Sequence, residues 1–78
     1  MMAETLRAAI KLKPFRPFTI RTDDGDSYLF THPETIIVSP DGATVAGFPN
    51  QGGIALIDLA SIAEIIAHPS ETKIGDGE

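Results

Sequence analysis

The stretch Pro14-Phe15-Arg16-Pro17-Phe18-Thr19-Ile20 separates two kinds of sequence pattern. Each proline fixes its own φ at about −65° and biases the residue before it away from helical geometry. The stretch therefore predicts that a helix ends before it and that an extended strand begins near Phe18.

Upstream of this stretch, residues 3–12 are predicted to form a short helix. Alanine and leucine favour helix, and Leu6, Ala9 and Ile10 recur at helical spacing. A helix of this length is not stable alone in water, so Leu6 and Ile10 are expected to pack on the rest of the domain.

Downstream, apolar residues alternate with polar ones, which is the pattern of half-buried strands. Asp24-Gly25 and Pro40-Asp41-Gly42 predict tight turns, because glycine accepts the positive φ that such turns require. The expected strands cover residues 18–21, 26–32, 35–39, 43–48 and 54–59.

Two later segments are less regular. Residues 54–59 carry apolar side chains on both sides of the expected strand. This pattern predicts a strand that is covered on both faces. The second face is expected to be covered by the N-terminal helix or by another subunit. Residues 60–68 fit either a helix or a short turn followed by a strand, and their three isoleucines favour the turn and strand.

These patterns predict one domain over residues 1–68, mainly β with an N-terminal α-helix. Its expected form is a small, strongly bent antiparallel sheet or an SH3-like or Sm-like barrel of about five strands. Residues 69–78 lack apolar mass and are expected to be a disordered tail. The absence of cysteine, of a secretory apolar run and of a membrane-spanning segment favours a soluble cytoplasmic protein that does not bind membranes.

Charge is concentrated at one end of the chain. Residues 1–21 carry one carboxylate, Glu4, whereas residues 22–78 carry ten carboxylates against Lys73 alone. The basic residues of the first part are Arg7, Lys11, Lys13, Arg16 and Arg21. They form either a solvated helix face or an interaction surface for carboxylates on the same domain or on a neighbouring copy. The acidic body repels phosphate, which counts against nucleic-acid binding.

Two motifs carry polar chemistry. In His32-Pro33-Glu34, an imidazole beside a carboxylate is suited to proton transfer or to part of a metal site. No nucleophile or phosphate loop accompanies it, so capping of backbone groups near Pro33 is the favoured interpretation. Asp23-Asp24-Gly25-Asp26 has the start of a calcium loop, with Glu34 at its twelfth position, but the strand-like Tyr28-Leu29-Phe30 between them favours a simple turn.

The chain also resembles a family of small uncharacterised bacterial proteins over roughly residues 3–67. The resemblance rests on the proline-phenylalanine stretch, on Asp23-Asp24-Gly25-Asp26-Ser27-Tyr28, His32-Pro33-Glu34 and a later Asp-Gly turn, and on Ile57-Asp58-Leu59-Ala60-Ser61-Ile62. It implies no activity, substrate or catalytic residue. The fold more distantly resembles Sm-like barrels, including the bacterial Sm-type RNA chaperone, which implies RNA binding. Here, however, the final segment carries Asp58 and Glu64 in place of a basic motif.

We therefore expect a non-enzymatic, self-associating protein-interaction module. A chain of 78 residues buries only about 60% of its unfolded surface, so its core is thin and association adds stability. No catalytic residue, cofactor or metal ligand is expected, and the expected partner is a second copy. Two alternatives stay open. One is an Sm-like RNA-binding protein that uses the five basic residues, and the other is a small enzyme centred on His32 and Glu34.

Overall fold

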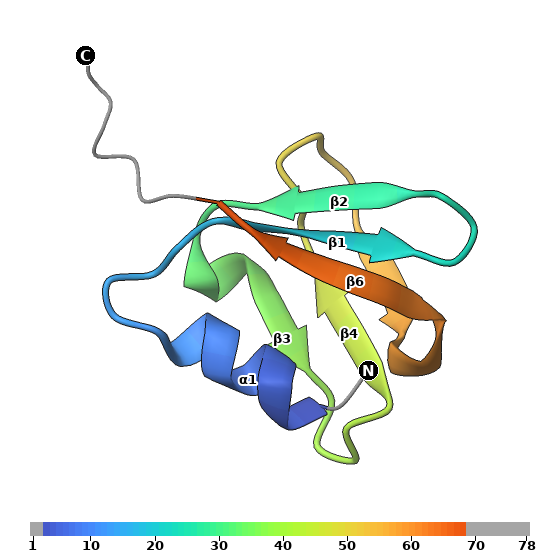
Figure 1. Ribbon diagram of the computed structural model, residues 1–78, viewed down its shortest axis with the longest axis horizontal. Coiled ribbons are helices and arrows are strands. Elements are labelled where there is room, and N and C mark those ends of the chain that lie inside the picture. Colours follow the sequence, from blue (N-terminus) through green and yellow to red (C-terminus); the bar gives the residue numbers. More distant parts are fainter. Residues whose placement is uncertain (1–2, 69–78) are drawn as a thin grey trace.

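The computed structural model describes residues 3–68, which form one helix and two three-stranded antiparallel sheets (Figure 1). The expected disorder of residues 69–78 lies outside the described residues. In chain order the elements are α1 (Ala3–Lys11), β1 (Phe18–Thr22), β2 (Ser27–Phe30), η1 (Pro33–Thr35), β3 (Ile36–Val38), β4 (Thr44–Gly47), β5 (Ala55–Asp58), η2 (Leu59–Ser61) and β6 (Ile62–Ala67), where η marks a 3-10 helix. No helix in the described part is long and apolar enough to cross a membrane.

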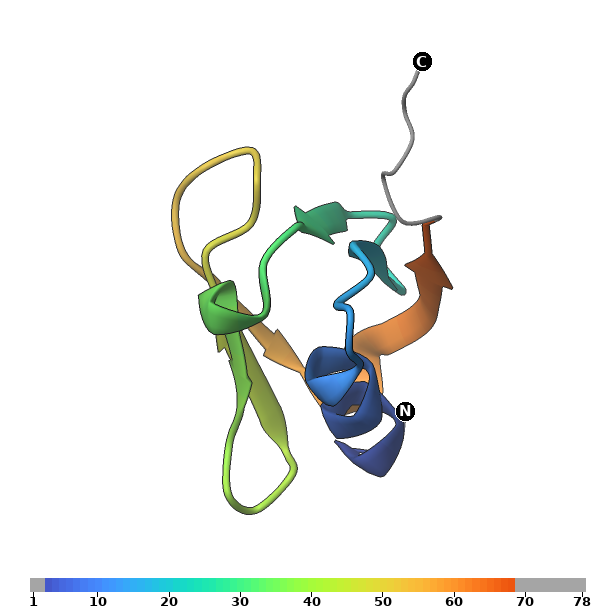
Figure 2. The ribbon, with the colours of Figure 1, turned by 90° about the vertical axis from the view of Figure 1, so that its left-hand side faces the viewer.

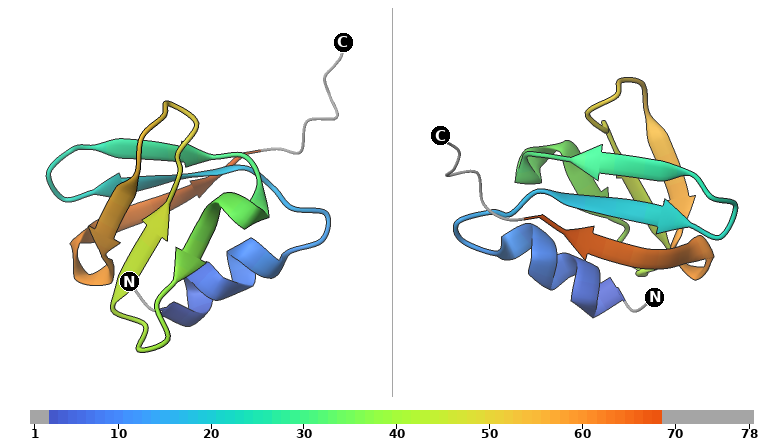
Figure 3. Two further views of the ribbon diagram at one scale, coloured as in Figure 1. Left: turned by 180° about the vertical axis from the view of Figure 1, so that it is seen from behind. Right: turned by 45° about the horizontal axis from the view of Figure 1, so that its top comes forward.

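The first sheet has the strand order β2-β1-β6 (Figure 3, right). The Asp24-Gly25 turn joins β1 to β2, and Gly25 has a φ of 92°, which glycine adopts without strain. The backbone N–H of Gly25 donates to the carbonyl of Thr22 at 3.0 Å and closes this turn. The expected hairpin is confirmed, and so is the turn followed by a strand over residues 60–68, which is formed by η2 and β6.

The second sheet has the strand order β3-β4-β5. The turn at Pro40-Asp41-Gly42 joins β3 to β4, and Gly42 has a φ of 74°. The side chain of Arg7 on α1 reaches this turn and donates from Nη2 to the carbonyl of Ser39 at 2.9 Å. The helix is thereby attached to the second sheet by a polar contact as well as by its apolar face.

The sheets do not close into a barrel, so the barrel interpretation is wrong. Residues 3–68 contain six strands, where about five were expected, and the two sheets share no strand pairing. Pro33 has no N–H to donate, and η1 turns the chain between β2 and β3, so the hydrogen-bond ladder stops there. The 3-10 turn η2 separates β5 from β6 in the same way.

The core lies between the sheets, with α1 beside β3 at the open side (Figure 2). Phe18 of β1 and Phe30 of β2 are fully buried, with their ring centroids 6.1 Å apart. Leu6 of α1 is fully buried as well, which confirms that the helix packs through this residue. The other buried apolar residues are Ile20, Ile36, Val45, Ala55, Ile57, Leu59 and Ile62.

The expectation that the N-terminal helix covers the second face of the strand at residues 54–59 is wrong, while cover by another subunit stays a prediction. Ala55, Ile57 and Leu59 are buried, whereas Ile54 and Leu56 are exposed. The helix does not cover this second face, because it lies beside β3 at the other edge of the sheet. The apolar side chains on the outer side of β5 therefore face solvent in the single copy.

Candidate interaction surfaces

An apolar surface covers the outer side of the β3-β4-β5 sheet, which faces the viewer in Figure 3 (left). Ile37 lies opposite Ala46, and Ala46 lies opposite Leu56, so the three residues form one row across the strands. Phe48 and Ile54 extend the face beyond the paired residues Gly47 and Ala55. We call these five residues (Ile37, Ala46, Phe48, Ile54 and Leu56) the outer face.

The outer face is accessible to solvent. Its large side chains are between 60% and 73% exposed, and they are Ile37, Phe48, Ile54 and Leu56. A hollow of about 230 Å³ opens among Ile37, Phe48 and Ile54, with Glu34 at its edge. The signal in the sequence was the run Ile36-Ile37-Val38, because alternation allows only one side of a strand to face the core.

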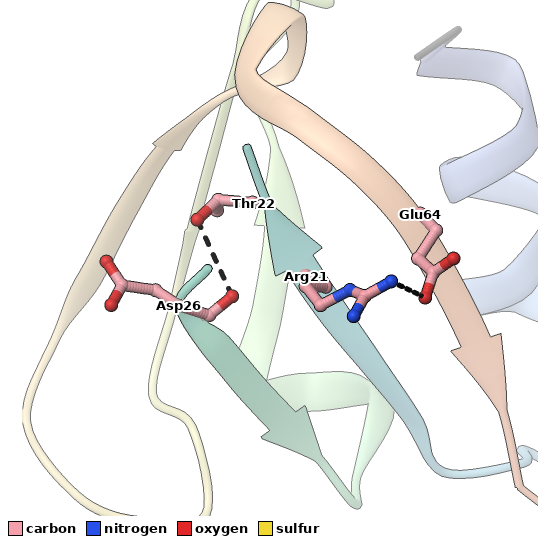
Figure 4. Close-up of polar contacts among 4 residues, drawn as sticks. All are labelled: Arg21, Thr22, Asp26 and Glu64. Atoms are coloured by element: carbon pink, nitrogen blue, oxygen red, sulfur yellow. Dashed lines mark hydrogen bonds and ion pairs between the residues drawn. The ribbon is translucent and has the colours of Figure 1, made fainter. Parts of the chain in front are cut away.

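The five basic residues of the first 21 are not gathered on one surface. Arg7, Lys11 and Lys13 border hollows along α1. Arg21 lies on β1 and forms an ion pair with Glu64 of β6 (Figure 4). Arg16 is exposed in the linker between α1 and β1. The cationic surface at α1 is therefore smaller than the sequence suggests, because it contains only three of the five basic residues, Arg7, Lys11 and Lys13.

Carboxylates from distant parts of the chain meet at another hollow, of about 340 Å³. It is lined by Asp24 and Asp26 of the β1–β2 turn and by Asp58 of β5. The carboxylate of Asp26 points away from Arg21 (Figure 4). Arg21 is not among the residues that line the hollow. No local motif in the sequence predicts this arrangement, because Asp58 is more than thirty residues from the turn.

The structure does not bring the positions of the calcium-loop pattern together at this acidic hollow. Within residues 3–68, no three His, Cys, Asp or Glu side chains lie close enough to hold a metal ion. Glu34, at the twelfth position of that pattern, borders the hollow on the outer face instead. Asp24 and Asp26 lie in the hairpin turn, as the turn interpretation expects.

His32 directly precedes η1, and Glu34 lies within it. His32 Nδ1 is 3.1 Å from the hydroxyl of Thr31, and the His32 carbonyl accepts a 2.6 Å hydrogen bond from the hydroxyl of Thr35. The His32 side chain does not cap the turn. In the described part of the chain, no ion pair or hydrogen bond joins His32 to Glu34. His68 is separate from both, and its Nε2 lies 2.8 Å from the hydroxyl of Thr19.

A shifted pKa is found at Asp41, in the turn between β3 and β4. The hydroxyl of Ser39 donates to its carboxylate at 2.6 Å, and the backbone N–H of Ala43 donates to the same oxygen at 3.0 Å. These bonds favour the charged form and lower the pKa of Asp41 below its ordinary value of 3.8. Because the group is fully exposed and bound within its own turn, its role is to shape the turn.

Comparisons of the chain with family models, with curated protein sequences and with solved structures find no match. The functional argument therefore depends on the geometry of these surfaces.

Proposed function

We propose that this protein is a non-enzymatic, self-associating interaction module and that its copies associate through the outer face. The observation that carries the proposal is the cross-strand row Ile37–Ala46–Leu56, continued by Phe48 and Ile54, on a sheet face that α1 does not cover. Burial of apolar surface is the main favourable contribution to most protein association.

The size of the outer face supports this proposal. Its four large side chains expose on the order of 500 Å² of apolar surface, and exposed apolar patches of this size often serve a function. A stable interface buries about 800 Å² on each partner. The outer face supplies more than half of that area, and its polar neighbours, such as Thr35 and Thr44, extend it.

The distribution of charge supports it too. The five residues of the outer face are uncharged, and carboxylates lie at its border. Glu34 lines the hollow beside Ile37, and the hollow that Leu56 borders is lined by Asp24, Asp26 and Asp58. An apolar centre with a polar or charged rim is the usual anatomy of a protein–protein interface.

The enzyme alternative has less support from the geometry. Proton transfer by His32 and Glu34 needs both side chains at one site within reach of a substrate. Glu34 borders the hollow on the outer face, whereas the contact of His32 is with the neighbouring Thr31.

The test is the molar mass in solution over a range of concentrations, measured by light scattering after size exclusion. The wild-type protein is expected to exceed the 8.3 kDa of one chain at high micromolar concentration. Leu56→Asp places a charge in the centre of the outer face and is expected to give a folded monomer. A wild-type protein that stays monomeric throughout would contradict the proposal.

The matched control is Ile66→Asp, which makes the same kind of change at a partly exposed position on β6 of the other sheet. It is expected to leave association unchanged. Circular dichroism of both variants checks that they are folded. Loss of association in both variants to the same extent would exclude the outer face as the specific contact.

A further inference from the structure

A second surface combines apolar and cationic groups in a different way. One hollow, of about 240 Å³, lies between α1 and β3 and is bordered by Arg7 and Ile37. Another, of about 690 Å³, lies where α1 ends and the linker begins, and is bordered by Leu12, Lys13 and Phe15. Ile10 and Lys11 line both, so the two hollows adjoin. We call these two adjoining hollows the α1 groove.

The cations of the α1 groove have no acidic counterpart in the described structure. No carboxylate among the described residues lines either hollow. Within residues 3–68, Lys11 and Lys13 form no ion pair, in contrast to Arg21, which pairs with Glu64. Arg7 donates to the carbonyls of Ser39 and Pro40, which are neutral acceptors, so its charge is held in place without being neutralised.

The apolar lining and the cationic border together define the chemistry of a ligand. We infer that the α1 groove binds a peptide segment of a partner protein that carries several carboxylates and a large apolar side chain. The carboxylates pair with Lys11 and Lys13, and the apolar side chain enters the hollow beside Leu12 and Phe15. This inference goes beyond self-association, because it concerns another kind of partner and a groove that shares only Ile37 with the outer face.

RNA fits the α1 groove less well than such a peptide. Binding of single-stranded RNA relies on aromatic rings that are free to stack with bases. Phe15 is the aromatic residue of the groove. Its ring packs against the ring of Phe18 in a tilted arrangement, with the two ring centroids 5.7 Å apart.

A membrane surface fits less well too. A helix that binds in the plane of a membrane inserts its apolar face among the lipids. The apolar face of α1 is already used, because Leu6 is fully buried in the protein core. Leu12, at the end of the helix, remains as a large exposed apolar side chain on this segment, and it borders the groove.

The inference can be tested with a fluorescein-labelled peptide of the sequence Glu-Glu-Leu-Glu-Glu-Leu-Glu-Glu, titrated with the full chain and followed by fluorescence anisotropy. Binding is expected, and it is expected to weaken as salt is added. The variant Lys11→Gln/Lys13→Gln is expected to bind about tenfold more weakly, since two exposed ion pairs are lost. A peptide with glutamine in place of glutamate is expected not to bind.

The matched control is Arg21→Gln, which removes one positive charge away from the groove and is expected to bind the peptide like the wild type. The Leu56→Asp variant separates this inference from self-association, because it is expected to retain peptide binding as a monomer. The inference is overturned if the wild type does not bind the peptide or if Lys11→Gln/Lys13→Gln has no effect. It is overturned equally if oligouridine or phosphatidylserine vesicles bind more tightly than the peptide.

Discussion

Gly47 of β4 packs its bare Cα against the ring of Phe30 of β2, where the two sheets meet. A Cβ at position 47 would lie 2.7 Å from Cε1 of Phe30 and 2.7 Å from the carbonyl oxygen of Thr35. Both distances are far shorter than van der Waals contact. Glycine is therefore required here by close approach of the sheets and of η1, and not by a positive φ.

Replacing Gly47 with alanine is expected to lower the free energy of unfolding by about 1–3 kcal/mol, because the extra methyl group overpacks the core. Urea denaturation measures the change. In a double-mutant cycle, Phe30→Leu is expected to relieve only part of the Gly47→Ala penalty, since the carbonyl of Thr35 remains in place. An unchanged unfolding midpoint for Gly47→Ala would show that the two sheets are not packed as described.

The turn between β3 and β4 gives a prediction on pH. The Ser39 hydroxyl and the Ala43 N–H hold the pKa of Asp41 below its ordinary value of 3.8. The turn is therefore stabilised at pH values above that ordinary value, and this stabilisation is lost as the pH falls through the lower folded-state pKa. Titration of the side-chain carboxyl by NMR measures the pKa directly. Ser39→Ala is expected to raise it towards 3.8, and a wild-type Asp41 that already titrates at or above 3.8 would refute the arrangement.

The ion pair of Arg21 and Glu64 gives a prediction on stability. The two residues are partners across β1 and β6, and their side chains are about half exposed. Exposed ion pairs contribute about 0.2–1 kcal/mol, and salt screens them. A double-mutant cycle of Arg21→Gln and Glu64→Gln is expected to give a coupling energy in this range that disappears at high salt. A coupling of several kcal/mol that persists in salt would contradict this account.

Much of the fold is predictable from local patterns. The linker prolines end the helix, and alternation places Phe18 and Ile20 in the core. The glycines at positions 25 and 42 have the positive φ that their turns require. These features depend on residues that are neighbours in the sequence, so they can be predicted from local patterns.

Closure of the sheet was not predictable in this way. Alternation shows which side chains share a face, but it does not show which strands pair. The separation into two sheets depends on the break at η1 after His32 and on η2, and both are short turns that a barrel also tolerates. The same limit applies to Ile54 and Leu56, because an apolar pattern in both phases is identical whether the second face is covered within the chain or open.

The candidate surfaces were predictable only in part. The basic character of the first 21 residues is evident in the sequence, but the structure places Arg21 beside Glu64, far along the chain, and leaves Lys11 and Lys13 at the α1 groove. Asp58 meets the hairpin carboxylates only because the β3-β4-β5 sheet packs against the β2-β1-β6 sheet. Contacts between residues distant in sequence carry no local signal.

Self-association through the outer face is tested most directly by NMR spectra of the amide groups, recorded as the protein is diluted from millimolar to low micromolar concentration. The account predicts concentration-dependent shifts for amides of β3, β4 and β5 around Ile37, Ala46 and Leu56, with those of β2 and β1 constant. Spectra that do not change on dilution, or changes confined to the β2-β1-β6 sheet, would contradict it.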